Sequence, residues 1–128
     1  TSVWSLALGR DAAAAEPEVR PLKDALLGAD FVVTTGLVLQ ELLQGFAGPK
    51  AREQIIDRFA ALPLLQPDRQ DHVDAAALRT TCRQAGVLVG TIDALIAQLC
   101  IRHELTLLTT DRDFSHMARH CPLRVWVA

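Results

Sequence analysis

Apolar residues recur along this chain with two spacings, which predict strands alternating with helices. Short runs of β-branched residues or leucine, closed by glycine, proline or polar residues, are typical of buried strands. Stretches in which apolar residues return every three or four positions are typical of helices that bury one face. The pattern predicts strands at 31–35, 62–66, 105–109 and 123–127, and helices at 2–8, 21–27, 37–45 (or to 48), 49–61, 68–85, from 91 past 100, and 113–119.

The same periodicity assigns side chains to the core. Residues three or four apart share one side of a helix, so the apolar ones among them are expected to face inward. The expected core residues are Leu39, Leu42, Leu43 and Phe46 in the helix from 37, Ile55, Ile56 and Phe59 in the next, Val73, Ala76, Ala77 and Leu78 in the long helix, and Ile92, Leu95, Ile96, Leu99 and Cys100 in the helix from 91.

The order of these elements predicts an α/β fold. Strands that alternate with helices form a parallel or mostly parallel sheet covered on both faces, which is a three-layer α/β/α sandwich. No repeat, low-complexity tract or flexible linker divides the sequence, so residues 1–128 are expected to form a single domain. Folds of this class place their sites beyond the carboxyl ends of the strands.

Composition narrows the class of protein. Half of the 128 residues are apolar and 22% are charged, which argues against disorder, and the apolar runs are too short to span a membrane. Three cysteines without a CxxC pair fit a reducing, cytoplasmic setting. The net charge of −2 excludes a protein that is basic overall. A nucleic-acid partner would therefore have to be attracted by local arginines and bound metal.

Four acidic side chains stand where a strand ends or a helix opens: Glu41, Asp93, Asp111 and Asp113. Carboxylates brought together in this way are suitable ligands for hard cations such as Mg²⁺ or Mn²⁺. Each acid also has a structural interpretation. Glu41 suits the positive end of a helix, and Asp93 suits an N-terminal capping position. Asp111 suits an N-cap or Asx turn, and Asp113 suits the start of a helix. Taken singly, none of them points to a metal more than to a helix end.

Considered together, the segments around these acids resemble PIN-domain nucleases. Thr91-Ile92-Asp93-Ala94-Leu95-Ile96-Ala97 and Leu107-Leu108-Thr109-Thr110-Asp111-Arg112-Asp113-Phe114 are similar to two motifs of that family, and Val38–Gly45 is similar to its helix with the pattern E-L-x-x-G. Thr1-Ser2-Val3-Trp4 resembles the residues that follow the family's first catalytic aspartate. The small size of the chain is most similar to the VapC toxin branch, whose members are ribonucleases neutralised by an antitoxin.

The resemblance also shows a departure from the family pattern. The family's first aspartate, at the end of its first strand, would stand directly before Thr1, and the sequence contains neither. The expectation is that the natural chain carries a further strand and aspartate in front of Thr1. An aspartate there would favour catalysis, whereas Asn, Gly or Ala would favour a module that binds without cutting.

The resemblance implies a mechanism and partners. Asp93, Asp111, Glu41 and Asp113 would hold Mg²⁺ or Mn²⁺, and a metal-activated water would hydrolyse RNA phosphodiesters. Ser2 and Thr109 would supply supporting hydroxyls. Arg112 could contact phosphate, although a solvated arginine is the simpler interpretation. A cognate antitoxin and a homodimer are the expected protein partners, because the apolar content of residues 22–65 exceeds what a small monomer needs.

Three alternatives stay open at this stage. A PIN nuclease could act in RNA processing without an antitoxin, and the absence of an antitoxin gene upstream would favour that interpretation. A PIN-like module could bind RNA or protein without cutting. A generic α/β domain could use the acids only at helix ends, and it would show no stabilisation by divalent cations.

Overall fold

The computed structural model describes residues 32–46 and 48–126. The chain divides into two compact units, residues 1–66 and 67–128, and each is described by itself. The helices predicted at 2–8 and 21–27 lie outside the described residues, as does Ser2. The remaining predicted elements can each be compared with the structure.

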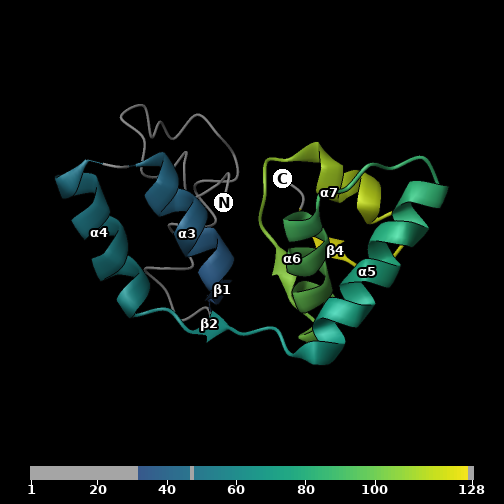
Figure 1. The fold of residues 1–128 in the computed structure, drawn as a ribbon, viewed down its shortest axis with the longest axis horizontal. Coiled ribbons are helices and arrows are strands. Elements are labelled where there is room, and N and C mark those ends of the chain that lie inside the picture. The colour runs from purple at the N-terminus through teal and green to yellow at the C-terminus, as the bar shows by residue number, and fades with distance from the viewer. Residues whose placement is uncertain (1–31, 47, 127–128) are drawn as a thin grey trace. The chain divides into compact units, whose positions relative to one another are not determined.

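In the first unit, strand β1 (Thr34–Thr35) leads directly into helix α3 (Gly36–Gly45). Thr35 ends the strand and caps the helix, because its Oγ1 accepts a hydrogen bond from the backbone N–H of Val38 at 3.2 Å. Helix α4 (Pro49–Ala60) follows, and strand β2 (Leu64–Leu65) pairs with β1 in parallel (Figure 1). The predicted strands and helices of this unit are confirmed, with shorter strands than expected.

Helix α4 buries only part of its predicted apolar face. Ile55 and Phe59 are buried, as expected for residues four apart. Ile56, also predicted to be buried, is 44% exposed, so that prediction is wrong. Because each helical residue is rotated by about 100° from the one before it, the narrow buried stripe that contains Ile55 leaves its neighbour outside.

The second unit contains helix α5 (Arg69–Gln84), helix α6 (Thr91–Arg102), strand β3 (Thr106–Leu107), helix α7 (Arg112–Met117) and strand β4 (Arg124–Val125). Strands β3 and β4 pair in parallel. The pairing extends by one hydrogen bond, which the N–H of Trp126 donates to the carbonyl of Leu107 at 2.9 Å. Helices α5 and α6 pack together along their lengths, and α6 also contacts β3.

A buried carboxylate ties the start of α5 to the end of α6. Asp68 and Asp71 form a capping box, in which each side chain accepts a backbone N–H from the other residue at 2.9 Å. Asp71 is only 1% exposed, and its Oδ1 lies 2.8 Å from Nε of Arg102. The N–H direction does not meet hydrogen-bond geometry for that oxygen. The contact is therefore best described as an ion pair that neutralises a buried charge.

The ion pair between Asp71 and Arg102 changes which face of α5 is buried. The buried residues are Asp71, Ala75 and Cys82, which share one side of the helix. Val73, which led the predicted apolar stripe, is 55% exposed, and Ala76 and Ala77 are also exposed. The prediction of this face was wrong because an apolar pattern cannot identify an aspartate as a core residue. The ion pair with Arg102 makes the burial of Asp71 possible.

Helix α6 forms the centre of the core of this unit. Leu95, Ile96, Leu99 and Cys100 are buried as predicted, whereas Ile92, in the first turn, is 43% exposed and its predicted burial is wrong. Burial raises the pKa of the Cys100 thiol to about 11, so the side chain stays neutral and packs as a small apolar group.

The α/β class with parallel strand pairing is confirmed. The strands are short: in each described strand pair, two residues of one strand pair with two residues of the other. Among residues 32–46 and 48–126, every helix is too short or too polar to cross a membrane. The prediction that the whole chain forms a single domain stays a prediction.

Replacing Arg102 with Met should lower the free energy of unfolding by about 1.5–3 kcal/mol, because it leaves the Asp71 carboxylate buried without its cation. Arg102 is 39% exposed, which keeps the expected loss below that of a fully buried pair. Denaturant unfolding measures the change. Arg69→Met is the control, since Arg69 is exposed at the start of α5, the helix that carries Asp71. Equal losses in the two variants would contradict the role of the ion pair.

Asp68 should make the second unit sensitive to acid. The backbone N–H of Asp71, helped by the charge of Arg102, holds the pKa of Asp68 below its ordinary 3.8. Because the pKa is lower in the folded chain, the carboxylate stabilises the fold above the unfolded-state pKa, and this contribution disappears as the pH falls through the folded-state pKa. Asp68→Asn keeps a cap acceptor but removes the charge. Its melting temperature should be lower than that of the wild type at pH 6, and the two should converge once the pH falls below the folded-state pKa of Asp68, which lies under 3.8. A difference in melting temperature that is independent of pH would contradict the stabilising role of the Asp68 charge.

Candidate functional site

Asp111 occupies a tightly held turn between β3 and α7. The backbone N–H of Asp111 donates to Oγ1 of the buried Thr109 at 3.0 Å. The carboxylate of Asp111 caps α7, with Oδ1 accepting the N–H of Asp113 at 2.9 Å. The N-cap role considered for Asp111 is therefore confirmed. Its other oxygen, Oδ2, makes no hydrogen bond or ion pair with a described residue, and the side chain is half-buried. The turn thus presents a carboxylate oxygen in a fixed orientation.

Asp113 and Arg112 extend this turn into the first residues of α7. Both side chains are exposed, and Asp113 stands in the first helical turn, where a negative charge is favoured by the helix dipole. The structure thus brings Thr109, Asp111 and Asp113 together in one hydrogen-bonded segment.

Asp93 lies in the first turn of α6, half-buried. The N-cap position of this helix is Gly90, which has no side chain to cap it. A negative charge at the position of Asp93 is favoured by the helix dipole, and a capping role for Asp93 stays a prediction. The predicted start of this helix at residue 91 is confirmed.

Glu41 does not lie at the start of its helix. It is the sixth residue of α3, half-buried, and the first turn of that helix contains no acidic side chain. Its placement near a positive helix end was wrong, because the helix begins at Gly36, directly after the β1 strand. Stabilisation by the dipole at the N-terminus falls off within the first turn, so it does not explain a glutamate at this position.

The four acids offer only carboxylate oxygens, the donors that hard divalent cations prefer, and their partly exposed positions suit an ion that keeps bound waters. Glu41 belongs to the first unit and the three aspartates to the second. Within residues 32–46 and 48–126, no three His, Cys, Asp or Glu side chains form a group that could hold a metal ion. The donor type therefore fits Mg²⁺ or Mn²⁺, and the joining of these acids into one centre stays a prediction from the sequence.

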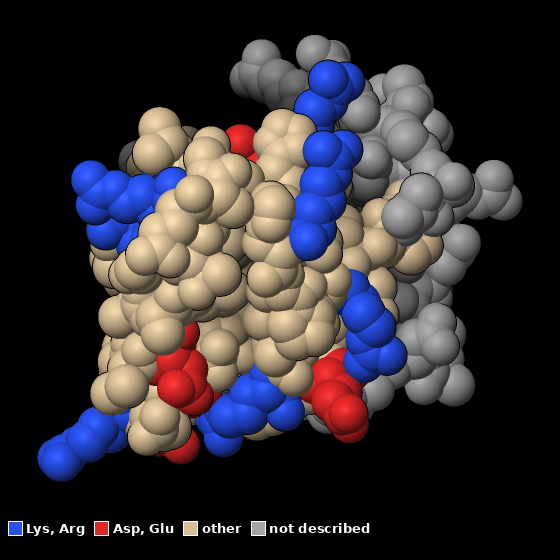
Figure 2. Space-filling view, turned by 90° about the vertical axis from the view of Figure 1, so that its right-hand side faces the viewer, with Lys and Arg blue, Asp and Glu red and all other residues tan. Residues whose placement is uncertain are grey.

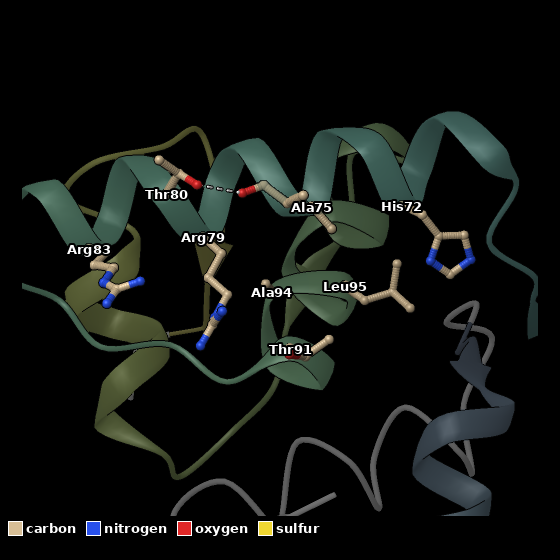
Figure 3. A pocket seen from close by; sticks show the side chains of 9 residues that line it. His72, Ala75, Arg79, Thr80, Arg83, Thr91, Ala94 and Leu95 are labelled. Carbon is tan, nitrogen blue, oxygen red and sulfur yellow. Dashed lines mark hydrogen bonds between the residues drawn. The ribbon is translucent and has the colours of Figure 1, made fainter.

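A hollow of about 280 Å³ lies between α5 and α6. No sequence pattern predicted it. Figure 3 shows Arg79 reaching from α5 toward Thr91, with Arg83 one turn further along the same helix. The spacing of four residues between the two arginines was the available signal, but it is common on exposed helices.

The loop that joins the two helices is held in place beside this hollow. Gly86, with φ of +84°, ends α5 in a backbone conformation that glycine adopts without strain. The N–H of Val87 then donates to the carbonyl of Cys82 at 2.8 Å, and Nε of Arg79 donates to the carbonyl of Val89 at 2.7 Å. The start of α6 is therefore fixed relative to α5.

Figure 2 shows how charged side chains are distributed over one face of the molecule. Lys and Arg side chains (blue) follow one another down the right of the described surface, and Asp and Glu side chains (red) lie mainly near its lower edge, close to other basic side chains. This distribution agrees with the net charge of −2 and leaves local arginine clusters as the attractive elements for an anion.

Comparison with solved structures shows which fold these elements build. The chain is similar to the crystal structure of VapBC2 from Rickettsia felis bound to a DNA fragment from their promoter, with a TM-score of 0.72 and 21% identity over 97% of this chain and 92% of the other. It is also similar to the structure of VapBC-1 from nontypeable Haemophilus influenzae, with a TM-score of 0.68 and 19% identity over 88% and 86% of the two chains. At these identities the likeness establishes the fold.

A family model described as PIN domain matches residues 1–120, a span that includes the segments around Glu41, Asp93 and Asp111. The predicted α/β architecture agrees with this match and with the fold of the two solved structures. Because the match covers nearly the whole chain, this protein belongs to the PIN domain family.

Proposed function

We propose that this protein is a metal-dependent endoribonuclease that hydrolyses RNA phosphodiesters, and that it is the toxin of a VapBC-type toxin–antitoxin pair. The observation that carries the proposal is the Asp111 turn: a half-buried carboxylate, held from both sides by Thr109 and Asp113, in a PIN domain. A nuclease site needs carboxylates whose orientation does not change when a cation or a phosphate arrives. A turn used only for capping needs no buried threonine behind it.

Asp93, Asp111 and Glu41 are proposed to hold Mg²⁺ or Mn²⁺, with Asp113 as a further or outer ligand. A bound cation would supply a Lewis acid that lowers the pKa of water and neutralises charge on the scissile phosphate. The protein's own contribution is to orient the carboxylates. Asp93 stands in the first turn of α6, and the N–H of Asp113 holds one carboxylate oxygen of Asp111 in place.

Three further residues are proposed to support the metal-binding carboxylates or to bind the RNA. The Thr109 hydroxyl positions the backbone of Asp111 and so orients its carboxylate. Arg112, exposed beside Asp111, is available for a phosphate of the RNA. Ser2 is proposed to supply a second hydroxyl.

An antitoxin protein is the proposed partner, and a homodimer the proposed assembly, in the cytoplasm. The two similar solved structures are VapBC complexes by their descriptions. A hollow of about 290 Å³ between α3 and α4, with Leu39 and Leu43 in its wall, offers an apolar contact in the first unit. The exposed side chains of Ile56 and Leu64 add to the apolar surface of that unit. Surfaces of this kind favour burial against a protein partner.

Incubation of the full-length protein with structured RNA should give cleavage in Mg²⁺ or Mn²⁺ and none in EDTA. Asp93→Asn and Asp111→Asn should each lower the cleavage rate by about a hundredfold or more, because each removes a charge that holds the cation. Gel analysis of the RNA products measures the rate. Asp57→Asn is the control, since Asp57 is an exposed acid on α4.

The result that contradicts the proposal is a folded protein that binds RNA but cuts none of a panel of RNAs in either metal. That result would favour the non-catalytic binding module. Cleavage without a protein that co-purifies and inhibits it would favour a PIN nuclease that acts without an antitoxin.

Thr109→Val should lower the cleavage rate by about tenfold and raise the Mg²⁺ concentration needed for half-maximal rate, since the change removes the hydroxyl that orients Asp111 but keeps the side-chain shape. Thr109→Ser should restore most of the activity. Thr106→Val, an exposed position on β3, is the matched control. Equal rates for Thr109→Val and Thr106→Val, in proteins of equal stability, would show that the hydroxyl does not serve the site.

A further inference from the structure

The hollow between α5 and α6 carries charge of one sign only. Among the residues in its wall, the ionisable side chains are Arg79, Arg83 and His72, and no carboxylate is present. In a protein of net charge −2, a concave surface lined by two guanidinium groups and free of acids is an attractive site for an anion. The remaining lining residues are small or apolar, except for the hydroxyls of Thr80 and Thr91.

The two arginines differ in how they are held. Nε of Arg79 donates to the carbonyl of Val89 at 2.7 Å, which places this guanidinium beside the entry to α6. Arg83 forms no ion pair or hydrogen bond with a described residue, and it lies one helical turn further along the same face. Their unused N–H groups are the kind of donors that bind phosphate oxygens in pairs.

A third feature of the hollow is the end of α6 itself. Thr91, the first residue of this helix, lines the hollow, and the N-cap residue before it, Gly90, has no side chain to cap the helix. Unsatisfied backbone N–H groups and the positive end of the helix dipole favour an anion at such a place. Figure 3 shows Thr91 and Arg79 facing the same space.

We propose that this hollow binds a backbone phosphate of the RNA, next to the phosphate that is cut. This proposal rests on the proposed nuclease function. Asp93 follows Thr91 by two residues in the same helical turn, so the two residues lie on different sides of one helix end. A single strand that crosses the end of α6 therefore meets both. Arg79 and Arg83 position the strand and take no part in the chemistry.

An RNA phosphate fits these observations better than an acidic peptide does. The hollow shares its helix turn with Asp93, which argues for a ligand that continues into the cleavage site. Contacts to phosphate are independent of base sequence, so the hollow should set the register of the strand and leave the choice of cleavage sequence to other residues.

Arg83→Gln tests the proposal, with Arg119→Gln as a control of equal charge change outside the hollow. Both are made in the Asp93→Asn protein, and binding of a fluorescent single-stranded RNA is followed by anisotropy at several salt concentrations. Arg83→Gln should weaken binding about threefold to tenfold for every RNA sequence, and it should reduce the slope of log K against log salt by about 0.7. Arg83→Lys should regain most of the affinity, and Arg119→Gln should bind like its parent.

Cleavage by the same variants with Asp93 intact separates this proposal from the nuclease proposal. If the wild type cuts RNA and Arg83→Gln binds RNA as tightly as Arg119→Gln, the hollow is not a phosphate site, and the nuclease function stands. If the wild type cuts no RNA, the nuclease function fails, and the proposal that rests on it is overturned as well. If Arg83→Gln loses affinity for a poly-glutamate peptide but keeps its affinity for RNA, the hollow serves an acidic protein partner and the proposal is overturned.

Discussion

A carboxylate buried to 1% exposure is costly unless a cation neutralises it, and Asp71 meets this requirement through Arg102 at 2.8 Å. The pair joins the first turn of α5 to the last turn of α6, so the two helices must run antiparallel. This arrangement brings the second half of α5 beside the start of α6, where Arg79 binds the carbonyl of Val89. The position of the first turn of α6, and therefore of Asp93, depends on this ion pair together with the hydrogen bond from Arg79.

The turn at Asp111 gives a side chain with a structural role a geometry that also suits its proposed role as a metal ligand. One carboxylate oxygen caps α7, while the buried Thr109 holds the backbone from the other side. Capping alone would be satisfied by any of several residues. The same bonds that satisfy the helix end also fix the direction of the second oxygen, which makes the carboxylate suitable as a ligand. The capping role of Asp111 and its proposed role as a ligand therefore do not exclude each other.

The failures of the sequence predictions have a common physical cause. Helix starts at Gly36, Pro49 and Thr91 were correctly located, because caps, prolines and glycines act over a few residues. Burial was wrong for Val73 and Ile92, because it depends on what packs against the helix. An apolar pattern has no means of recognising that Asp71 has a partner in Arg102, some thirty residues away. The hollow between α5 and α6 is likewise formed by residues from two helices.

The sequence by itself determined the α/β class, the helix and strand order from residue 32 onward, and the acids that stand at or near element ends, because each of these depends on neighbours within one or two turns. The family resemblance, carried by the same local segments, agrees with the PIN domain match. Only the tertiary structure decided that an aspartate lies in the core and that two arginines share a hollow with the start of α6. These features arise from contacts between distant segments, whose energies no local pattern contains.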